Sequence, residues 1–565
     1  MTDQKLAALA ADHFAAMMSA EPFWATMFGV PGYDALAPDR SREAATTRLA
    51  TIDALSGRLD GIDAAGLSDT DQITYSMLRR ELTDERDQLA AGLLEVSVSA
   101  GVAGALSEVL AAVPTVTITG AEAAEAYLSR LGNLAGFFDG LLERHRQAVA
   151  DGRTPTALGV RQAIEQVDGY LAAPDADPLL RPAPPAGVDA DAWRARIGHV
   201  LTDALHPALR RYRDGLASAL LPVGRDEEHV GVCHVPGGPE GYLAAVRGHT
   251  TTELTPDEIH QLGLTFVTEL RGEFAELGGR ALGTDDVPEV LRRLREDPAL
   301  RFETAEQIVD TARVALARAE EALPEWFHSY PTAPCEVREM HPSEAKGGVL
   351  GYYMPPAGDG SRPGLHVINT YAPQTRPRFE YEALAFHESV PGHHTQIAIS
   401  QTLTDLPDFR RFGFVTAHGE GWGLYSERLG EEMGLYTSDL ARLGMVSFDA
   451  WRACRLVVDT GMHHLGWSRT QAIEFMRDNT ALSESNIVNE VDRYIAMPGQ
   501  ALAYLVGRIR IRQLRERARQ ALGTSFDIRD FHHQVLGHGP LPLDTLGDVV
   551  DRWVARGGKD AGVPA

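Results

Sequence analysis

Cysteine is scarce in this sequence, and the three cysteines that it has are far apart. They are Cys233, Cys335 and Cys454. An odd number of widely spaced cysteines argues against a disulfide framework and against a zinc finger built on cysteine pairs. We therefore expect a reduced, cytoplasmic environment.

Basic charge is also in short supply. The chain has 53 lysine and arginine residues against 79 aspartate and glutamate residues, which gives a net charge of −26. No block of basic residues interrupts this acidity, so the sequence lacks the electrostatic footprint of phosphate binding. We expect no nucleic-acid partner.

Long apolar runs are missing as well. No window reaches the ~18 consecutive apolar residues of a membrane-spanning helix. The first residues lack the basic segment and apolar core of a signal peptide. We therefore expect no membrane partner. What is present is an ordinary globular composition, with 44% hydrophobic and 23% charged residues, so a large core is available.

Most of the chain has the pattern of helices, because apolar residues recur at three- and four-residue spacing. Short β-branched and aromatic runs typical of strands occur only between Cys335 and Tyr371, separated by proline and glycine turns. The expected fold class is mainly α with a small antiparallel sheet. The expected organisation is one unit over 1–565, with two possible lobes at 1–235 and 236–565, a sheet at 333–371 and a functional segment at 387–420.

The densest chemical motif is FHESVPGHHTQ, which contains His387, Glu388, His393 and His394. In the zincin motif HExxH, two histidines on one helix face bind a metal ion, and the intervening glutamate is the general base. Here Pro391 stands where the second histidine would be. On an unbroken helix the side chains of His387 and His393 would point about 120° apart and could not share a metal ion.

A helix break at Pro391 and Gly392 removes this obstacle. Proline in a helix clashes with the carbonyl four residues back, and glycine tolerates the backbone angles that return the chain. We therefore expect the chain to bend so that His387 and His393 bind one Zn²⁺ ion. His394 is the alternative to His393 as the second histidine ligand.

A third ligand is needed, because catalytic zinc typically has three protein ligands and one open position. The best candidate is Glu420, in the next helical segment AHGEGWGLYSERLG. Glu427 lies two helical turns further on and is either an alternative ligand or a partner that orients one. With these ligands, Glu388 would take a proton from the water that the metal activates.

Several motifs occur in a fixed order over nearly the whole chain. They include HESVPGHH, GEGWGLYSE, RACRLVVDTGMHHLGW and EVDRYIAMPGQALAYLVG. In these motifs the sequence resembles the bacterial family known as domain of unknown function 885. Its members resemble helical, gluzincin-type zinc peptidases such as thimet oligopeptidase and angiotensin-converting enzyme. The resemblance implies a helical body split by a deep cleft, with the small sheet on the cleft wall. The sequence departs from those peptidases at the two-residue insertion that contains Pro391.

A polar stripe follows on the helix predicted around residues 451–464. Arg452, Arg455, Asp459 and His463 recur at spacings of three and four on an otherwise apolar segment. The two arginines are candidates for binding a peptide carboxylate, and Asp459 for orienting a catalytic His463. The alternative interpretation is a buried ion-pair network between helices.

Two tyrosines and the strands complete the candidate site. Tyr494 and Tyr504 are alternative donors of a hydrogen bond to the developing oxyanion, unless they only pack. In the related peptidases a tyrosine after the glutamate ligand has this role. A strand at a sheet edge can pair with an extended peptide, so Tyr352, His366 and Asn369 are candidate substrate-binding residues.

The favoured hypothesis is zinc-dependent hydrolysis of peptide bonds in short peptides, by an oligopeptidase, carboxypeptidase or dipeptidase. A first alternative is a non-haem Fe(II) enzyme, because two histidines and one carboxylate also bind iron. In such an enzyme Glu388 would have no evident task. A second alternative is a helical binding protein whose site is inactive. The peptide specificity, the cleavage position and the oligomeric state are left open.

Overall fold

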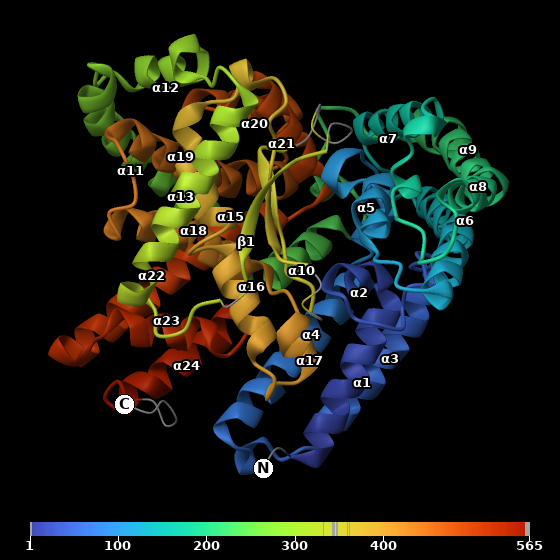
Figure 1. Ribbon diagram of the computed structural model, residues 1–565, viewed down its shortest axis with the longest axis horizontal. Helices are drawn as coiled ribbons and strands as arrows, with labels where there is room; N and C mark the ends of the chain where they lie inside the picture. Colours follow the sequence, from blue (N-terminus) through green and yellow to red (C-terminus); the bar gives the residue numbers. More distant parts are fainter. Residues whose placement is uncertain are drawn as a thin grey trace.

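The computed structural model describes residues 3–331, 333–341, 345, 349–358, 360 and 362–559. Helices make up most of this part of the chain, and one small sheet lies near the middle of the molecule (Figure 1). The prediction of a mainly α protein is confirmed.

Polar caps start many of the helices in the first half of the chain. The Ser41 hydroxyl accepts the N–H of Ala44, and the Ser68 hydroxyl accepts the N–H of Asp71. Such caps satisfy backbone donors that the first helical turn leaves free. The helices of this half are α1 (Gln4–Ala20), α2 (Pro22–Phe28), α3 (Arg42–Asp60), α4 (Asp69–Ala91), α5 (Ala105–Ala112), α6 (Ala121–Ala150), α7 (Ala157–Leu171), α8 (Ala190–Val200), α9 (His206–Gly215) and α10 (Gly238–Thr250).

The second half is helical before and after the sheet. The Thr255 hydroxyl and the Glu258 carboxylate cap each other's backbone N–H groups at the start of the first helix of this half. The helices here are α11 (Pro256–Leu282), α12 (Val287–Glu296), α13 (Ala305–Trp326), α15 (Tyr381–Glu388), α16 (His393–Thr402), α17 (Asp408–Phe412), α18 (Thr416–Glu432), α19 (Asp439–His463), α20 (Arg469–Asn479), α21 (Glu484–Ala496), α22 (Ala503–Leu522), α23 (Ile528–Leu536) and α24 (Leu543–Ala555).

The sheet is mixed, which corrects the prediction of an antiparallel one. Its strands, in spatial order, are β1 (Cys335–Glu339), β3 (Gly364–Ile368) and β2 (Gly351–Met354). Strands β2 and β3 are antiparallel, with Tyr353 opposite His366, whereas β1 and β3 are parallel, with Cys335 opposite Gly364. The chain reverses between β2 and β3, and β3 lies between the two earlier strands. Its other neighbour, β1, runs in the same direction as β3.

Apolar side chains pack into two large cores. One is formed by residues 98–220 together with Phe23, and it occupies the region of α5 to α9 in Figure 1. The other joins α1, α3 and α4 to residues 230–553. The division into lobes at residue 235 stays a prediction. Within the described residues, no helix has both the length and the apolar composition needed to cross a membrane.

Helix α19 lies deep in the larger core, and nearly all of its residues from Ala441 to His463 are buried. It packs along α11, and α18 packs along α22. Such a helix has no solvent face, so a polar group on it needs a partner inside the protein. A polar side chain of α19 that has such a partner has a structural role, and one without it is a candidate for ligand binding.

Candidate metal centre

Three helices bring His387, His393 and Glu420 together. His387 lies in the last turn of α15, His393 begins α16, and Glu420 lies near the start of α18. The Nε2 atoms of both histidines are 3.5 Å from Glu420 Oε2. One ligand atom from each residue lies within 4.8 Å of the other two. We refer to these three residues as the triad.

The chain break between α15 and α16 makes this arrangement possible. Helix α15 ends at Glu388 and α16 begins at His393, so the two imidazoles face each other with ring centroids 4.7 Å apart. A Cβ atom on Gly392 would lie 1.9 Å from the carbonyl oxygen of His387. Only glycine fits such a close approach, which explains its place after Pro391.

Helix α18 holds the break in position. The carbonyl oxygen of Pro391 accepts a hydrogen bond from Trp422 Nε1 at 2.8 Å and from Ser426 Oγ at 3.3 Å. On the same helix, a Cβ atom on Gly423 would lie 2.7 Å from Cε1 of His387. The absence of a side chain at Gly423 thus lets the imidazole lie directly against the helix.

Glu427 orients His387. Its Oε1 atom is 2.8 Å from His387 Nδ1, so that nitrogen donates to the carboxylate and Nε2 faces Glu420. A carboxylate on the far nitrogen is the usual support of a histidine that binds a metal through its other nitrogen. Of the two roles predicted for Glu427, the geometry therefore fits the orienting partner.

His394 has no nitrogen left for a metal. Its Nε2 donates to the carbonyl oxygen of Ala333 at 3.0 Å, and its Nδ1 accepts from the Tyr353 hydroxyl at 2.9 Å. Burial lowers the pKa of His394 to about 4, so the ring stays neutral in these two bonds. The structure therefore favours His393 over His394 as the second histidine of the site.

The charge and burial of the triad fit a divalent cation. The side chains of His387, His393 and Glu420 are 3%, 10% and 13% exposed. Burial opposes a charge on His387, yet the carboxylates of Glu420 and Glu427 outweigh it and raise the pKa of the ring to about 9. Glu420 Oε2 is buried without a hydrogen-bond partner in the described residues. Two imidazole nitrogens and one carboxylate oxygen are a donor set that zinc accepts.

Glu388 directly follows the first histidine and ends α15. The residue is half-buried. Its carboxylate has no hydrogen-bond or ion-pair partner in the part of the chain that the structure describes. A carboxylate next to a metal ligand that makes no other interaction is available to accept a proton.

The two candidate tyrosines differ in their surroundings. The Tyr494 hydroxyl donates to Glu490 Oε2 at 2.5 Å and accepts from Arg455 Nε at 2.8 Å and from Trp451 Nε1 at 3.0 Å. Its one proton is therefore used. The charge of Glu420, together with burial, raises the pKa of the Tyr504 hydroxyl, whereas no triad residue shifts the pKa of Tyr494. Tyr504 is the better candidate donor.

His463 and Asp459 have structural partners, contrary to the predicted pairing between them. His463 Nε2 donates to the carbonyl oxygen of Tyr494 at 3.0 Å, and Nδ1 accepts the N–H of Val232 at 3.2 Å. Asp459 instead accepts from the Tyr242 hydroxyl at 2.6 Å and from the backbone N–H of Gly499. Both ring nitrogens of His463 are thus occupied, so the expectation that it acts in catalysis is not supported by its geometry.

The arginines of the polar stripe are buried, 5% and 3% exposed at Arg452 and Arg455. Arg455 Nη2 is 2.8 Å from Glu490 Oε2, whereas the nearest acidic atom to Arg452 is Glu427 Oε1 at 3.7 Å. Glu427 therefore lies between Arg452 of the stripe and His387 of the triad. The sequence analysis did not identify Glu490 as the partner of Arg455 and Tyr494. Its position four residues before Tyr494, on the same helix face, is the signal that could have found it.

The candidates on the sheet are placed less favourably. His366 and Asn369 are fully buried, and His366 lies in the central strand β3, which has no free edge. The Asn369 amide donates to the carbonyl oxygens of Ala345 and Val349, so it supports the chain before β2. Tyr352 lies on the edge strand β2 and is half-buried. Of the three, only Tyr352 keeps the position that pairing with a peptide requires.

A second cluster with metal-binding side chains lies outside the predicted site. It consists of His328, Asp527 and Asp530. His328 Nε2 is 2.7 Å from Asp530 Oδ1, and both Asp527 oxygens accept from Arg529. These groups are partly exposed and already paired, so the cluster resembles surface ion pairing.

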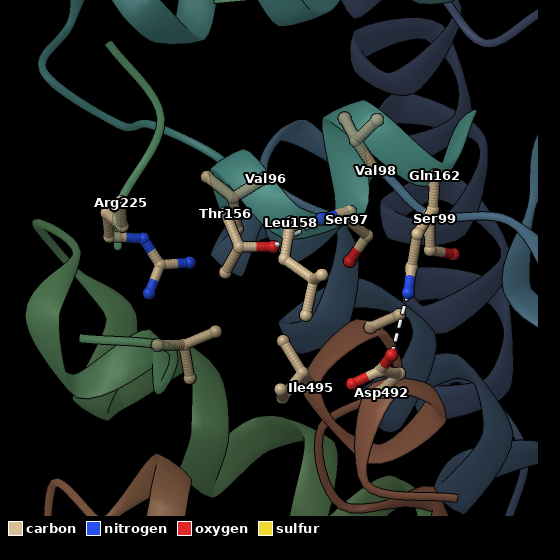
Figure 2. Close-up of a pocket in the computed structure, with 13 residues that line it drawn as sticks. Val96, Ser97, Val98, Ser99, Thr156, Leu158, Gln162, Arg225, Asp492 and Ile495 are labelled. Atoms are coloured by element: carbon tan, nitrogen blue, oxygen red, sulfur yellow. Dashed lines mark hydrogen bonds between the residues drawn. The ribbon is translucent and has the colours of Figure 1, made fainter. Parts of the chain in front are cut away.

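Figure 2 shows a pocket away from the triad, where α7 and α21 approach each other. Gln162 donates to Asp492 across it at 2.7 Å, and Arg225 lies at the other end of the view. Its cavity volume is about 10 Å³, enough for about one water molecule. A peptide substrate does not fit there.

The fold and site thus define a mainly α protein with a buried cluster of two histidines and one carboxylate. The chain belongs to the family of bacterial proteins of unknown function known as DUF885, whose model matches residues 22–550. No curated protein matches it.

Two solved structures are similar over nearly their whole length. One, a predicted lipoprotein from Colwellia psychrerythraea, is 26% identical with a TM-score of 0.91, and the match covers 98% of this chain and 99% of that one. The other, a predicted lipoprotein of unknown function from Shewanella oneidensis, is 18% identical with a TM-score of 0.73 and covers 96% and 99%. At this lower identity the likeness concerns the fold alone.

Proposed function

We propose that this protein is a zinc-dependent peptidase that hydrolyses short peptides. The observation that carries the proposal is the triad, in which two histidine nitrogens converge on one carboxylate oxygen beside an unpartnered glutamate. The order of these residues supports it further. A glutamate immediately after the first histidine ligand is what hydrolysis needs, because it can accept the proton of the attacking water.

The protein residues divide the work as follows. His387, His393 and Glu420 hold the metal, and Glu427 keeps His387 turned toward it. When bound, Zn²⁺ acts as a Lewis acid toward water and the peptide carbonyl. Glu388 accepts a proton from water and returns it to the leaving amine, so that one peptide bond and one water yield a carboxylic acid and an amine. Tyr504 donates a hydrogen bond to the carbonyl oxygen as it becomes negative.

The resemblance to helical gluzincin-type peptidases supports the same function. In that comparison the glutamate ligand lies on the helix after the histidine motif; here Glu420 lies on α18, which follows the histidine-bearing α15 and α16 after the short helix α17. The finer architecture, a deep cleft with the sheet on its wall, stays part of the proposal. A cleft of that kind would admit short peptides and exclude folded proteins.

Metal content and hydrolysis together test the proposal. The protein is purified without chelators, its metal is measured by elemental analysis, and it is incubated with a mixed peptide library whose products are read by mass spectrometry. We expect about one zinc per chain and cleavage that a chelator stops and added zinc restores. Iron with oxygen consumption would favour the Fe(II) enzyme, and a protein without tightly bound metal would favour an inactive binding protein.

The cellular location is a separate proposal. The scarce cysteines favour the cytoplasm, whereas the two similar structures are described as lipoproteins. Fractionation of cells that carry the chain with a C-terminal tag separates the two possibilities. Recovery with the soluble cytoplasmic fraction is expected, and recovery with membranes would contradict it.

A further inference from the structure

A buried guanidinium with unmade hydrogen bonds lies near the triad, and its nearest carboxylate oxygen is Glu427 Oε1 at 3.7 Å. Arg452 has a side chain that is 5% exposed, and no described residue accepts a hydrogen bond from its Nε or Nη1. An ionised group that is buried with unmade hydrogen bonds is energetically expensive. Such a group in a folded protein requires an explanation, and a bound ligand is one.

The carboxylates around Arg452 have other partners. Glu427, the nearest, accepts a hydrogen bond from His387 Nδ1 at Oε1, and its buried Oε2 has no hydrogen-bond partner in the described residues. Asp449 is paired with two other arginines. Glu380 accepts a hydrogen bond from a serine hydroxyl. None of these three carboxylates forms a hydrogen bond with the Arg452 guanidinium in the described structure, so its Nε–H and Nη1–H groups can still donate to an acceptor from outside the protein.

Aromatic rings pack against the guanidinium of Arg452. The Cζ atom of Arg452 is 4.5 Å from the Phe448 ring centroid and 4.3 Å from that of Trp451. Arg455, one helical turn later, is 4.4 Å from Trp451 and 4.3 Å from Tyr504, and its Nη1 also lacks a partner. A guanidinium fixed in this way presents parallel N–H groups, which match the two oxygens of a carboxylate.

The position of the pair limits which carboxylate can reach it. Arg452 connects to His387 through Glu427, by contacts of 3.7 and 2.8 Å. These contacts reach His387 at Nδ1, so they place the guanidinium near the triad through Glu427. Because Arg452 and Arg455 are both enclosed, a peptide cannot continue past them. An enclosed end fits a chain terminus.

We propose that Arg452 and Arg455 bind the free C-terminal carboxylate of the substrate. The protein is then an exopeptidase that removes one or a few residues from the C-terminus of short peptides. This inference rests on the proposed zinc peptidase activity, and it supplies the substrate class and the cleavage position that the triad alone leaves open.

The first test uses the wild-type protein and two forms of one peptide. One form has a free C-terminus, and the other has a C-terminal amide and is otherwise identical. We expect kcat/KM for the free acid to exceed that for the amide by ~100-fold, because the amide leaves a buried charge unpaired. Mass spectrometry should place the cut within a few residues of the C-terminus.

The second test assigns this preference to the arginines. Arg452→Gln should reduce the ratio of the two kcat/KM values from ~100 to nearly 1. Arg452→Lys retains the charge but lacks the paired N–H groups of the guanidinium, so it should give an intermediate ratio. Arg196→Gln is the matched control, because Arg196 forms an exposed pair with Glu125 on the surface and should leave the ratio unchanged.

Three outcomes would overturn the inference. The first is equal cleavage of the free acid and the amide. The second is equal cleavage of the free acid and of an amide that carries glutamate near its end, which would assign the arginines to an acidic side chain. The third is no cleavage of either form by the zinc-loaded protein, which overturns the proposed function as well. The comparison of peptides needs only the wild-type protein, so it stands even where a variant fails to fold.

Discussion

Two adjacent histidines have opposite surroundings, and the difference shows how this protein separates structure from function. His394 is hydrogen-bonded at both ring nitrogens. His393 points Nε2 at Glu420 from 3.5 Å, and its Nδ1 has no hydrogen-bond partner in the described residues. The residues share a helix turn and a residue type. What distinguishes them is whether the protein completes their hydrogen bonds.

The same contrast separates two larger groups. The network of Asp459, His463 and Tyr494 is closed by protein donors and acceptors. Around the triad, by contrast, Glu420 Oε2 and Arg452 Nε are buried without partners. Buried polar groups are normally satisfied, so a closed network indicates a structural role and an open one indicates a place for ligands. Each prediction below tests a residue of the open or the closed group against a control or against the wild-type protein.

The largest effect is expected at Glu388. Glu388→Gln keeps the size of the side chain and removes its capacity to accept a proton. We expect hydrolysis to fall by ~10³-fold or more while one zinc per chain is retained. Glu516→Gln, at an exposed surface pair, should have no effect. Full activity of Glu388→Gln would remove this residue from the mechanism.

Variants of His393 and His394 give the clearest comparison. His393→Gln removes a proposed metal ligand, so zinc affinity measured by competition with a chelator should fall by ~100-fold or more, beyond the usual loss of an orienting partner. His394→Gln should leave zinc affinity nearly intact and lower the free energy of unfolding by ~1–3 kcal/mol, because buried partners lose their bonds. The reverse result would make His394 the ligand.

Tyr504→Phe removes the proposed oxyanion donor and nothing else near the triad. We expect kcat to fall by ~100-fold with zinc content unchanged. Tyr494→Phe leaves Glu490 and Arg455 with unmade bonds, so it should act mainly on stability in denaturant unfolding. A larger loss of kcat in Tyr494→Phe at equal stability would exchange the two roles.

Glu427→Gln tests the orientation of His387. The amide can still accept the Nδ1 proton but carries no charge, so zinc affinity should fall by ~10–100-fold. Glu382→Gln is the control on α15, where Glu382 pairs with Arg318 and is bonded by Thr437. An unchanged zinc affinity in Glu427→Gln would show that this hydrogen bond does not support the ligand.

The smallest effect concerns pH. Burial lowers the pKa of His463 to about 4, whereas in the unfolded chain it is near 6.5. Between these values the unfolded chain binds the additional proton, so the stability contributed by neutral His463 is present above pH 6.5 and is lost as pH falls toward 4. From pH 7 to 5, wild type should therefore lose ~2 kcal/mol more unfolding free energy than His463→Gln. Equal losses in urea titrations would show that the ring titrates normally.

Much of the fold and part of the site could be predicted from local patterns. The helical class follows from apolar spacing, and the break after Glu388 follows from proline and glycine chemistry. Local patterns could not tell which residues of the polar stripe are structural and which are available to a ligand. His463 and Arg452 lie on the same buried helix, yet one is bonded to the backbone of a segment 231 residues earlier, at Val232, and the other has no such partner.

The sequence by itself determined the candidate ligand residues, the chain break that brings His387 and His393 together and the mainly α class, because these depend on residue chemistry and on spacing along the chain. The tertiary structure decided the direction of β1 against β3 and the choice of His393 over His394. It also decided which buried polar groups are left open. The physical reason is that the hydrogen-bond partners of a buried side chain come from residues that are distant in the chain, and only packing brings them into contact.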